Sequence, residues 1–146
     1  MKVGNKIKTK NASWTFDKNV PKTFSKHIES SVPFYKESHN ICVELSDFFL
    51  KNNSYCYDLG CSTGTLLDKL SNRNDKNINF IGIDSVKSMI NQAKKEVKIR
   101  KNSNKIKFIN GDFLKLNFKK SDLITSFYTI QFINPKHRQE LIDKIF

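Results

Sequence analysis

The chain has 146 residues, enough for one domain with a real hydrophobic core. Its formal net charge is +12, but 23 of the 26 basic residues are lysines, and most are scattered rather than aligned with aromatic side chains on one face. We therefore expect no direct binding of nucleic acid. The sequence has no secretory signal or long apolar stretch, and its three cysteines lack metal-ligand spacing. These features predict reduced thiols, no metal site, no membrane insertion and a cytoplasmic location.

The first third of the chain predicts a tail followed by a helical cap. Residues 1–12 are polar and lack periodicity, so we expect a mobile tail, and we assign residues 13–52 to the cap. The stretch "TFSKHIESSV" predicts a short helix that is interrupted at Pro33. The stretch "KESHNICVELSDFFLK" predicts a longer amphipathic helix. Its expected apolar face consists of Ile41, Cys42, Leu45, Phe48 and Phe49.

Residues 53–146 alternate between strand and helix patterns. The predicted strands are "YCYDLG", "INFIGID", "NKIKFINGD" and "DLITSFYTIQFI". The predicted helices are "GTLLDKL", "SVKSMINQAKKEVKI" with Ser85 as N-cap, and "NPKHRQELIDKIF" with Asn134 as cap and Pro135 in its first turn. This alternation predicts an α/β fold with a partial parallel sheet of about four strands and right-handed crossovers.

Three acidic residues follow predicted strands, and they would meet at one edge of the sheet. They are Asp58, Asp84 and Asp112, and glycines accompany each of them. Ligands of doubly wound sheets bind beyond the carboxyl ends of the strands. Taken singly, each acid could also be turn or capping chemistry. All three after apolar runs favour a ligand site.

The turn after the first strand indicates the class of ligand. Gly60-Cys61-Ser62-Thr63-Gly64 lacks the second and third glycines of a dinucleotide-binding loop, and no Gly-Lys-Ser/Thr follows it. S-adenosylmethionine (SAM) fits better, because it has no phosphate. Asp58 and the turn would face its methionine end, Asp84 would accept hydrogen bonds from the ribose hydroxyls, and Asp112 would accept one from the adenine amino group.

Five longer motifs resemble a known family. They are "FDKNVPKTFSKHIESSVPFY", "YDLGCSTG", "IGIDSVKSMI", "INGDF" and "YTIQFINPKHRQELIDKIF". They resemble class I SAM-dependent methyltransferases and, within them, the family of carboxy-S-adenosyl-L-methionine synthases. The resemblance implies a Rossmann-like class I methyltransferase fold, of which residues 53–146 would be the N-terminal part, preceded by the helical cap.

The resemblance also implies an activity and partners. Such synthases convert SAM, used as a substrate, and prephenate to carboxy-S-adenosylmethionine and phenylpyruvate. A partner transferase then uses the product to modify the wobble uridine of tRNA, so direct tRNA binding is not expected here. The family implies a homodimer.

Carried over by position, the resemblance gives the site residues. Tyr35 would reach over the ligand from the cap. Gly60, Cys61 and Ser62 would line the methionine moiety with backbone groups. The ribose would contact Asp84 and Ser85, and the adenine would contact Asp112 and Phe113. Ser126 lies where the family usually has asparagine. No catalytic residue is assigned.

The family's carboxylate-recognising arginine and tyrosine lie downstream of Phe146. We therefore expect a truncated chain that binds SAM weakly and turns over poorly. Two alternatives stay open. One is an ordinary SAM-dependent methyltransferase of small molecules. The other is a non-catalytic remnant that pairs through its open sheet edge.

Overall fold

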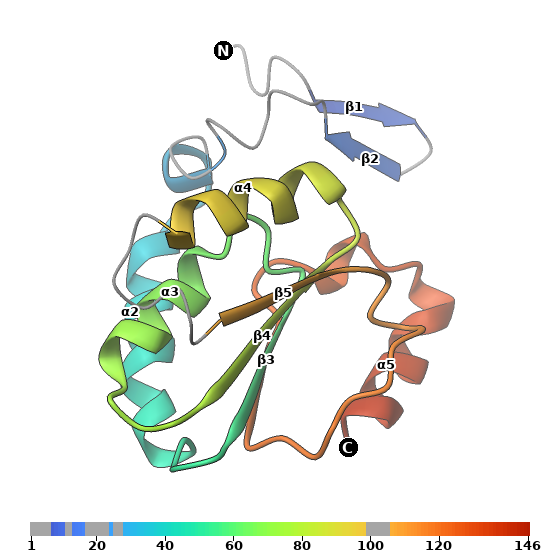
Figure 1. The fold of residues 1–146 in the computed structure, drawn as a ribbon. Coiled ribbons are helices and arrows are strands. Elements are labelled where there is room, and N and C mark those ends of the chain that lie inside the picture. The colour runs from blue at the N-terminus through green and yellow to red at the C-terminus, as the bar shows by residue number, and fades with distance from the viewer. Residues whose placement is uncertain (1–6, 11–12, 17–23, 25–27, 99–105) are drawn as a thin grey trace.

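The protein is described here from a computed structural model, which describes residues 7–10, 13–16, 24, 28–98 and 106–146. Its first elements are the antiparallel strands β1 (Ile7–Lys10) and β2 (Ser13–Phe16), visible in Figure 1. Strand β1 lies within residues 1–12, which the sequence predicted to be a mobile tail. Both strands are rich in β-branched and aromatic residues, which favour such pairing over their short length. Of the first cap helix, residues 28–31 are helical, and most of the rest lies outside the described residues.

The main sheet has four strands in the order β5-β4-β3-β6, and each neighbouring pair is parallel. The strands are β3 (Tyr55–Leu59), β4 (Asn79–Asp84), β5 (Ile106–Asn110) and β6 (Leu123–Thr125). This arrangement confirms the predicted α/β class with a partial parallel sheet. Because all four strands run the same way, their carboxyl ends meet at one edge, called here the carboxyl edge.

Three helices cover one face of the sheet (Figure 1). They are α2 (Tyr35–Leu45), α3 (Thr65–Arg73) and α4 (Lys87–Lys98). Cys56, Phe80 and Phe108 project from the strands into this layer and are almost fully buried. They pack with Leu67 and Leu70 of α3, so the largest apolar cluster lies between these helices and the sheet.

A second apolar cluster lies on the opposite face, beneath α5 (Arg138–Ile145). Tyr57, Leu59 and Ile83 contribute from the strands, and Leu141 from α5 is 1% exposed. Alternate residues of β3 thus point into opposite layers, as strand geometry requires. The two short 3₁₀ helices η3 (Ile130–Phe132) and η4 (Pro135–His137) connect β6 to α5. The Asn134 side chain caps η4 by accepting from the Lys136 N–H, so the predicted cap is confirmed, one turn before α5 begins.

The predicted apolar face of the second cap helix was wrong except at Cys42. Ile41, Leu45, Phe48 and Phe49 are each more than half exposed. The helix ends at Leu45 and continues as the 3₁₀ helix η1 (Ser46–Phe48). The inward stripe is instead Tyr35, His39, Cys42, Val43 and Ser46, which also has helical spacing. Two sets of residues in this segment therefore have helical spacing, and the more polar set faces the protein interior.

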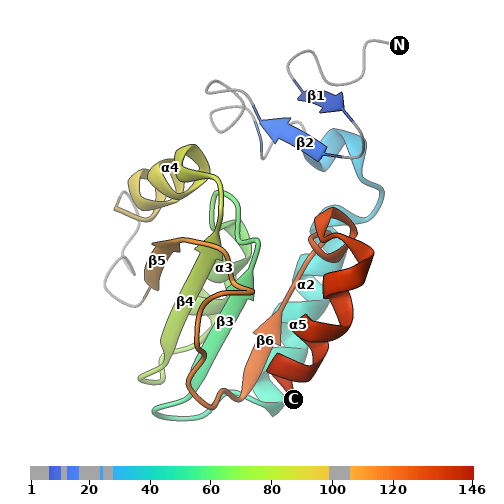
Figure 2. The same ribbon diagram turned by 90° about the vertical axis from the view of Figure 1, so that its right-hand side faces the viewer.

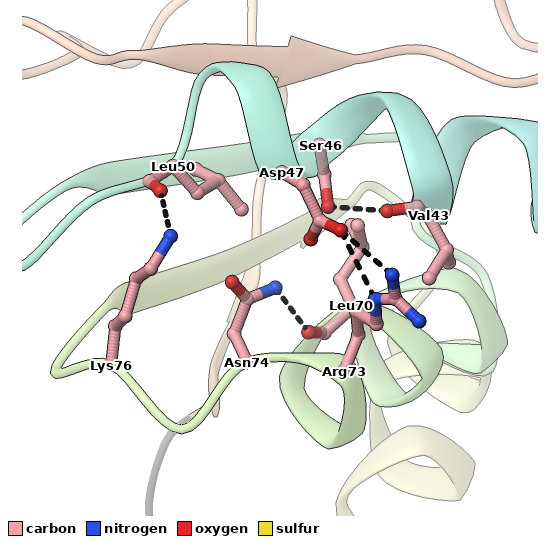
Figure 3. Close-up of polar contacts among 8 residues, drawn as sticks. All are labelled: Val43, Ser46, Asp47, Leu50, Leu70, Arg73, Asn74 and Lys76. Carbon is pink, nitrogen blue, oxygen red and sulfur yellow. Dashed lines mark hydrogen bonds and ion pairs between the residues drawn. The ribbon is translucent and has the colours of Figure 1, made fainter.

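Polar contacts attach the α2–η1 segment to the end of α3 (Figure 3). Arg73 donates from Nε and Nη2 to Asp47 at 3.2 and 2.8 Å. The Lys76 ammonium donates to the Leu50 carbonyl at 2.7 Å. Since the Arg73–Asp47 pair is exposed, it contributes orientation more than stability. Among the described residues, no helix has the length and apolarity that crossing a membrane requires.

Gly82 in β4 is where the core tolerates no side chain. A Cβ there would approach Cys61 Sγ, Leu67 Cδ1 and Phe108 Cδ1 at 2.8 Å each. We expect Gly82→Ala to lower the free energy of unfolding by about 1–3 kcal/mol through overpacking, measured by urea denaturation.

Gly111→Ala is the matched control, because its Cβ would meet nothing nearer than Leu116 Cδ1 at 3.4 Å. We expect it to change stability by less than about 0.5 kcal/mol. Equal effects of the two variants would contradict this packing of the β4 face.

Candidate functional site

The turn that follows β3 is fixed to the end of β4. The N–H groups of Gly60 and Cys61 both donate to the Ile83 carbonyl, at 2.8 and 3.1 Å. Gly60 and Gly64 have φ values of 74° and 79°, and Ser62, which is not glycine, has a φ of 51°. Positive φ is costly for a residue with a side chain and collects at functional sites. The turn is therefore held in a conformation that its own sequence only partly favours.

Asp84 holds this turn through its carboxylate. One oxygen accepts from the Ser62 N–H at 2.9 Å, and the other accepts from the Val86 N–H at 2.8 Å. Burial raises the pKa of Asp84 above its ordinary value, and the two N–H donors partly oppose that shift. Each carboxylate oxygen can accept more than one hydrogen bond, so capacity for ligand hydroxyls is left.

Ser85 is not the N-cap of α4, which corrects the prediction from sequence. The helix begins at Lys87, and Asp84 rather than Ser85 supplies the side-chain oxygen ahead of it. Ser85 is exposed at the carboxyl edge, and its carbonyl accepts from the Asn110 side chain at 3.0 Å. An aspartate two residues before an N–H can form the same local bond that a capping serine would form.

Asp58 is a buried carboxyl group at the end of β3. Its side chain accepts a hydrogen bond from Thr125 Oγ1 of β6 at 2.8 Å, and the residue is 3% exposed. Burial raises the pKa of Asp58 to about 7, with a smaller contribution from the negative charge of Asp84, while the Thr125 hydrogen bond opposes the rise. A cation beside this group would favour its charged form.

An aromatic cluster lies next to Asp58, on α2 and the segment after β6. The Tyr35 and His39 rings are 4.3 Å apart, and Tyr35 and Tyr128 stack at 6.1 Å. His39 also meets Phe127 edge-on at 5.1 Å. Burial and then the charge of Asp58 raise the pKa of Tyr35 to about 12, which places the two side chains in one electrostatic environment.

His39 is a neutral, buried member of this cluster. Burial, aided by the charge of Lys69, lowers its pKa to about 4. Its Nδ1 atom is buried and has no hydrogen-bond partner among the described residues. Our sequence reasoning missed His39, Thr125 and Tyr128. For His39 there was a signal, because it lies four residues after Tyr35 and so shares its helix face.

The remaining predicted residues are more dispersed. Asp112 is exposed after β5 and accepts from the Leu114 N–H at 3.0 Å. Phe113 is 9% exposed and packs in the cluster beneath α5, so little of its ring is accessible to a base. Ser126 Oγ is buried without a hydrogen-bond partner among the described residues. The binding roles of these three residues stay predictions.

Cys61 contributes backbone and volume rather than thiol chemistry. It is 5% exposed, and burial raises the pKa of its thiol well above the ordinary value, with further contributions from Asp58 and Asp84. A thiol in that state is a poor nucleophile. Across the described part of the chain, no group of three or more histidine, cysteine, aspartate or glutamate side chains could hold a metal ion.

Comparison with known proteins identifies the family. Residues 57–146 match the family described as a methyltransferase domain. The chain belongs to this family. It is 41% identical over 131 residues to a carboxy-S-adenosyl-L-methionine synthase of Nautilia profundicola, covering 90% of this chain and 55% of that protein. A synthase of the same name from Staphylococcus epidermidis is 39% identical, covering 91% of this chain and 57% of that protein.

These relatives confirm the resemblance found in the sequence, and the chain spans about half of their length. Solved structures agree on the fold. A SAM-dependent methyltransferase from Aquifex aeolicus has a TM-score of 0.66 at 20% identity, covering 90% of this chain and 68% of that one. Magnesium protoporphyrin IX methyltransferase from Synechocystis has a TM-score of 0.63 at 18% identity, covering 76% and 50%. The class I methyltransferase fold is thereby confirmed.

The buried carboxyl of Asp58 predicts a pH dependence of stability. Its folded-state pKa of about 7 lies above the ordinary value of 3.8, so its contribution is fully present below pH 3.8 and lost as the pH rises through about 7. We expect Asp58→Asn to raise the free energy of unfolding at pH 8 by about 1–3 kcal/mol, since one unit of pKa corresponds to about 1.4 kcal/mol. Urea denaturation at pH 5 and pH 8 measures this. The exposed Asp122→Asn serves as control, and equal stabilities of Asp58→Asn and wild type at pH 8 would contradict it.

His39 predicts that the free energy of unfolding changes with pH in the opposite direction. Its folded-state pKa of about 4 lies below the ordinary 6.5, so its contribution is present above pH 6.5 and lost as the pH falls through about 4. In Asp58→Asn, where Asp84 is left as a group with a raised pKa, the stability that the neutral His39 contributes should still be lost between pH 6.5 and 4. Adding His39→Phe should remove that fall, as followed by thermal unfolding. A slope that persists in the double variant would assign it to another group.

Proposed function

We propose that this chain binds SAM at the carboxyl edge and acts in the synthesis of carboxy-S-adenosylmethionine from SAM and prephenate. The observation that supports the binding site best is the shared edge of Asp58, Asp84 and the strained Gly60–Ser62 turn. The reaction rests on the 41% and 39% identity to proteins named for it. Because the chain spans about half of those proteins, the reaction is proposed for an enzyme of their full length.

The residues of the site fit the chemical groups of SAM. Asp58 is a buried carboxyl group whose charged form a sulfonium or ammonium would favour. Tyr35, whose pKa the charge of Asp58 helps to raise, stacks on Tyr128, and aromatic rings attract desolvated cations. A SAM sulfonium placed between these groups would meet negative charge and π density at once.

The other half of SAM would follow the carboxyl edge from β3 to β5. Asp84 retains acceptor capacity for the ribose hydroxyls and already orders the turn through Ser62. Ser85 is exposed next to it. Asp112 is exposed after β5, at the same edge of the sheet. It would accept a hydrogen bond from the adenine amino group. We propose that the Ser126 hydroxyl makes a polar contact with the bound SAM, because it is buried and has no hydrogen-bond partner among the described residues.

The proposed chemistry balances without a redox partner. Prephenate loses carbon dioxide and hydroxide as it becomes phenylpyruvate. The hydroxide takes a proton from the SAM methyl group, giving water and a sulfonium ylide. The ylide carbon then forms a bond to carbon dioxide, which gives carboxy-S-adenosylmethionine. Asp58 would favour the cationic sulfur on which the ylide depends.

The proposal includes the setting in which the reaction takes place. We propose a homodimeric, cytoplasmic enzyme whose product passes to a separate transferase that modifies the wobble uridine of tRNA. The alternative is ordinary methyl transfer, which the broad description of the matching family would also fit. Release of S-adenosylhomocysteine in the presence of a methyl acceptor would distinguish it from carboxylation, which retains the whole SAM skeleton.

Asp84 provides the sharpest test of the ligand site. We expect Asp84→Asn to weaken SAM binding at least about tenfold, which corresponds to about 1.4 kcal/mol, because it removes the charge that accepts from the ribose and holds the turn. Isothermal titration calorimetry measures the affinity. The control is Asp75→Asn, an exposed aspartate in the loop after α3. Unchanged affinity in Asp84→Asn would contradict the proposed site.

A further inference from the structure

The segment that follows β6 makes a tight turn centred on Tyr128. The chain leaves β6 at the carboxyl edge and enters η3 and η4 before it turns back as α5 (Figure 2). Tyr128 has a φ of 51°, in the left-handed region that a residue with a bulky side chain rarely adopts. The Thr129 hydroxyl donates to the Phe127 carbonyl at 3.0 Å across this turn. Thr129 therefore closes the turn with its own side chain.

The same threonine packs on the turn that follows β3. A Cβ atom at Gly60 would clash with Oγ1 and Cγ2 of Thr129. The Thr129 side chain thus occupies the space that a side chain at Gly60 would need, and it lies directly against the backbone there. Gly60 belongs to the turn for which we propose contact with the methionine end of SAM. Thr129 therefore joins two turns, the one after β3 and the one after β6.

The turn after β6 holds an aromatic ring that is only partly buried. Tyr128 is 40% exposed, and its ring stacks on that of Tyr35 with centroids 6.1 Å apart and planes 29° apart. Left-handed backbone costs free energy, and a ring this exposed gains little from burial to offset that cost. The conformation does fix the Tyr128 ring against Tyr35. Residues held in such conformations collect at ligand sites.

The connection from β6 to α5 explains only part of this arrangement. The Thr129 carbonyl accepts from the Phe132 N–H at 3.0 Å, so Thr129 also begins η3. That bond uses the backbone, which most other residues would supply equally well. The bond to the Phe127 carbonyl needs the hydroxyl, and the contact with Gly60 involves both branches of the side chain. These two contacts are what a role in the ligand site would use.

We propose that Thr129 is a positioning residue of the ligand site. Its hydroxyl holds Tyr128 in the left-handed conformation, which places the Tyr128 ring on Tyr35. Its packing on Gly60 fixes that ring relative to the turn after β3. Thr129 acts through these neighbours and not by contact with the ligand. The inference rests on the proposed SAM site, and it adds a residue outside the predicted binding set that determines how tightly SAM is held.

Two substitutions separate the hydroxyl group of Thr129 from the shape of its side chain. Thr129→Val keeps both branches and removes the hydroxyl, and we expect it to weaken SAM binding at least about fivefold in isothermal titration calorimetry. Thr129→Ser keeps the hydroxyl and should bind SAM within about twofold of the wild type. A side chain that only filled space would give the reverse order, because valine matches the shape of threonine better. Circular dichroism checks folding, and Thr129→Ala, which also lacks the hydroxyl, replaces a valine variant that does not fold.

Fluorine NMR follows the Tyr128 ring without any ligand. The chain has four tyrosines, and all of them are replaced by meta-fluorotyrosine. The resonance that disappears in Tyr128→Phe is that of Tyr128, and stacking displaces it from the position of free fluorotyrosine. We expect Thr129→Val to move this resonance toward the free position, and Thr129→Ser to leave it in place.

Ser71→Ala is the matched control. It also removes a hydroxyl that donates to a backbone carbonyl, that of Asp68 at 3.0 Å, but within α3. Its SAM affinity and its Tyr128 resonance should equal those of the wild type. The inference is overturned if Thr129→Val retains wild-type affinity, if it leaves the Tyr128 resonance unmoved, or if Ser71→Ala weakens binding equally. A wild-type chain that binds no SAM would refute the proposed site itself, and the inference with it.

Discussion

The parallel register of β3 with its two neighbours is the constraint on which the rest of the site depends. Asp58 lies opposite Gly82 of β4 and opposite Thr125 of β6. The first pairing leaves room for the turn after β3 to fold over β4, because Gly82 has no side chain. The second brings the Thr125 hydroxyl to the Asp58 carboxyl. A slip of one residue would direct Asp58 into the opposite apolar layer.

The same register produces a conflict between stability and function. A carboxyl group as buried as Asp58 costs folding free energy when it is charged, which is the physical meaning of its raised pKa. The cost is reduced when a cation lies beside it. A site that is unfavourable when empty and favourable beside a sulfonium is what selective binding of a charged ligand requires.

The sequence was sufficient for those features that depend on chain order and strand pattern. Apolar runs that end in an acid, each followed by a helical pattern, predicted the parallel sheet and the edge where Asp58 and Asp84 lie. What it could not supply depends on tertiary competition. Two sets of residues on α2 had helical spacing, and hydrophobicity favoured the set that, apart from Cys42, is exposed. The predicted N-cap role of Ser85 was wrong, because the side chain that accepts a hydrogen bond just ahead of α4 is that of Asp84.

Apolar side chains are exposed on one flank of a fold that is closely packed elsewhere. Gly64, Gly82 and Phe108 show how closely the α3–α4 layer fits the sheet. By contrast, the flank formed by α2 and β6 has exposed apolar side chains, and β6 pairs with β3 alone among the described strands. The ligand edge lies at the end of that strand, so the two features meet near Thr125 and Ser126.

The central claim is that the carboxyl edge around Asp58 and Asp84 is a SAM site, and native mass spectrometry tests it most directly. The purified chain is incubated with SAM and prephenate, and the bound small molecule is then released and weighed. The account predicts one ligand per chain, with the mass of SAM or of SAM carrying one additional carboxyl group. A chain that stays folded and retains neither molecule at saturating SAM would contradict it.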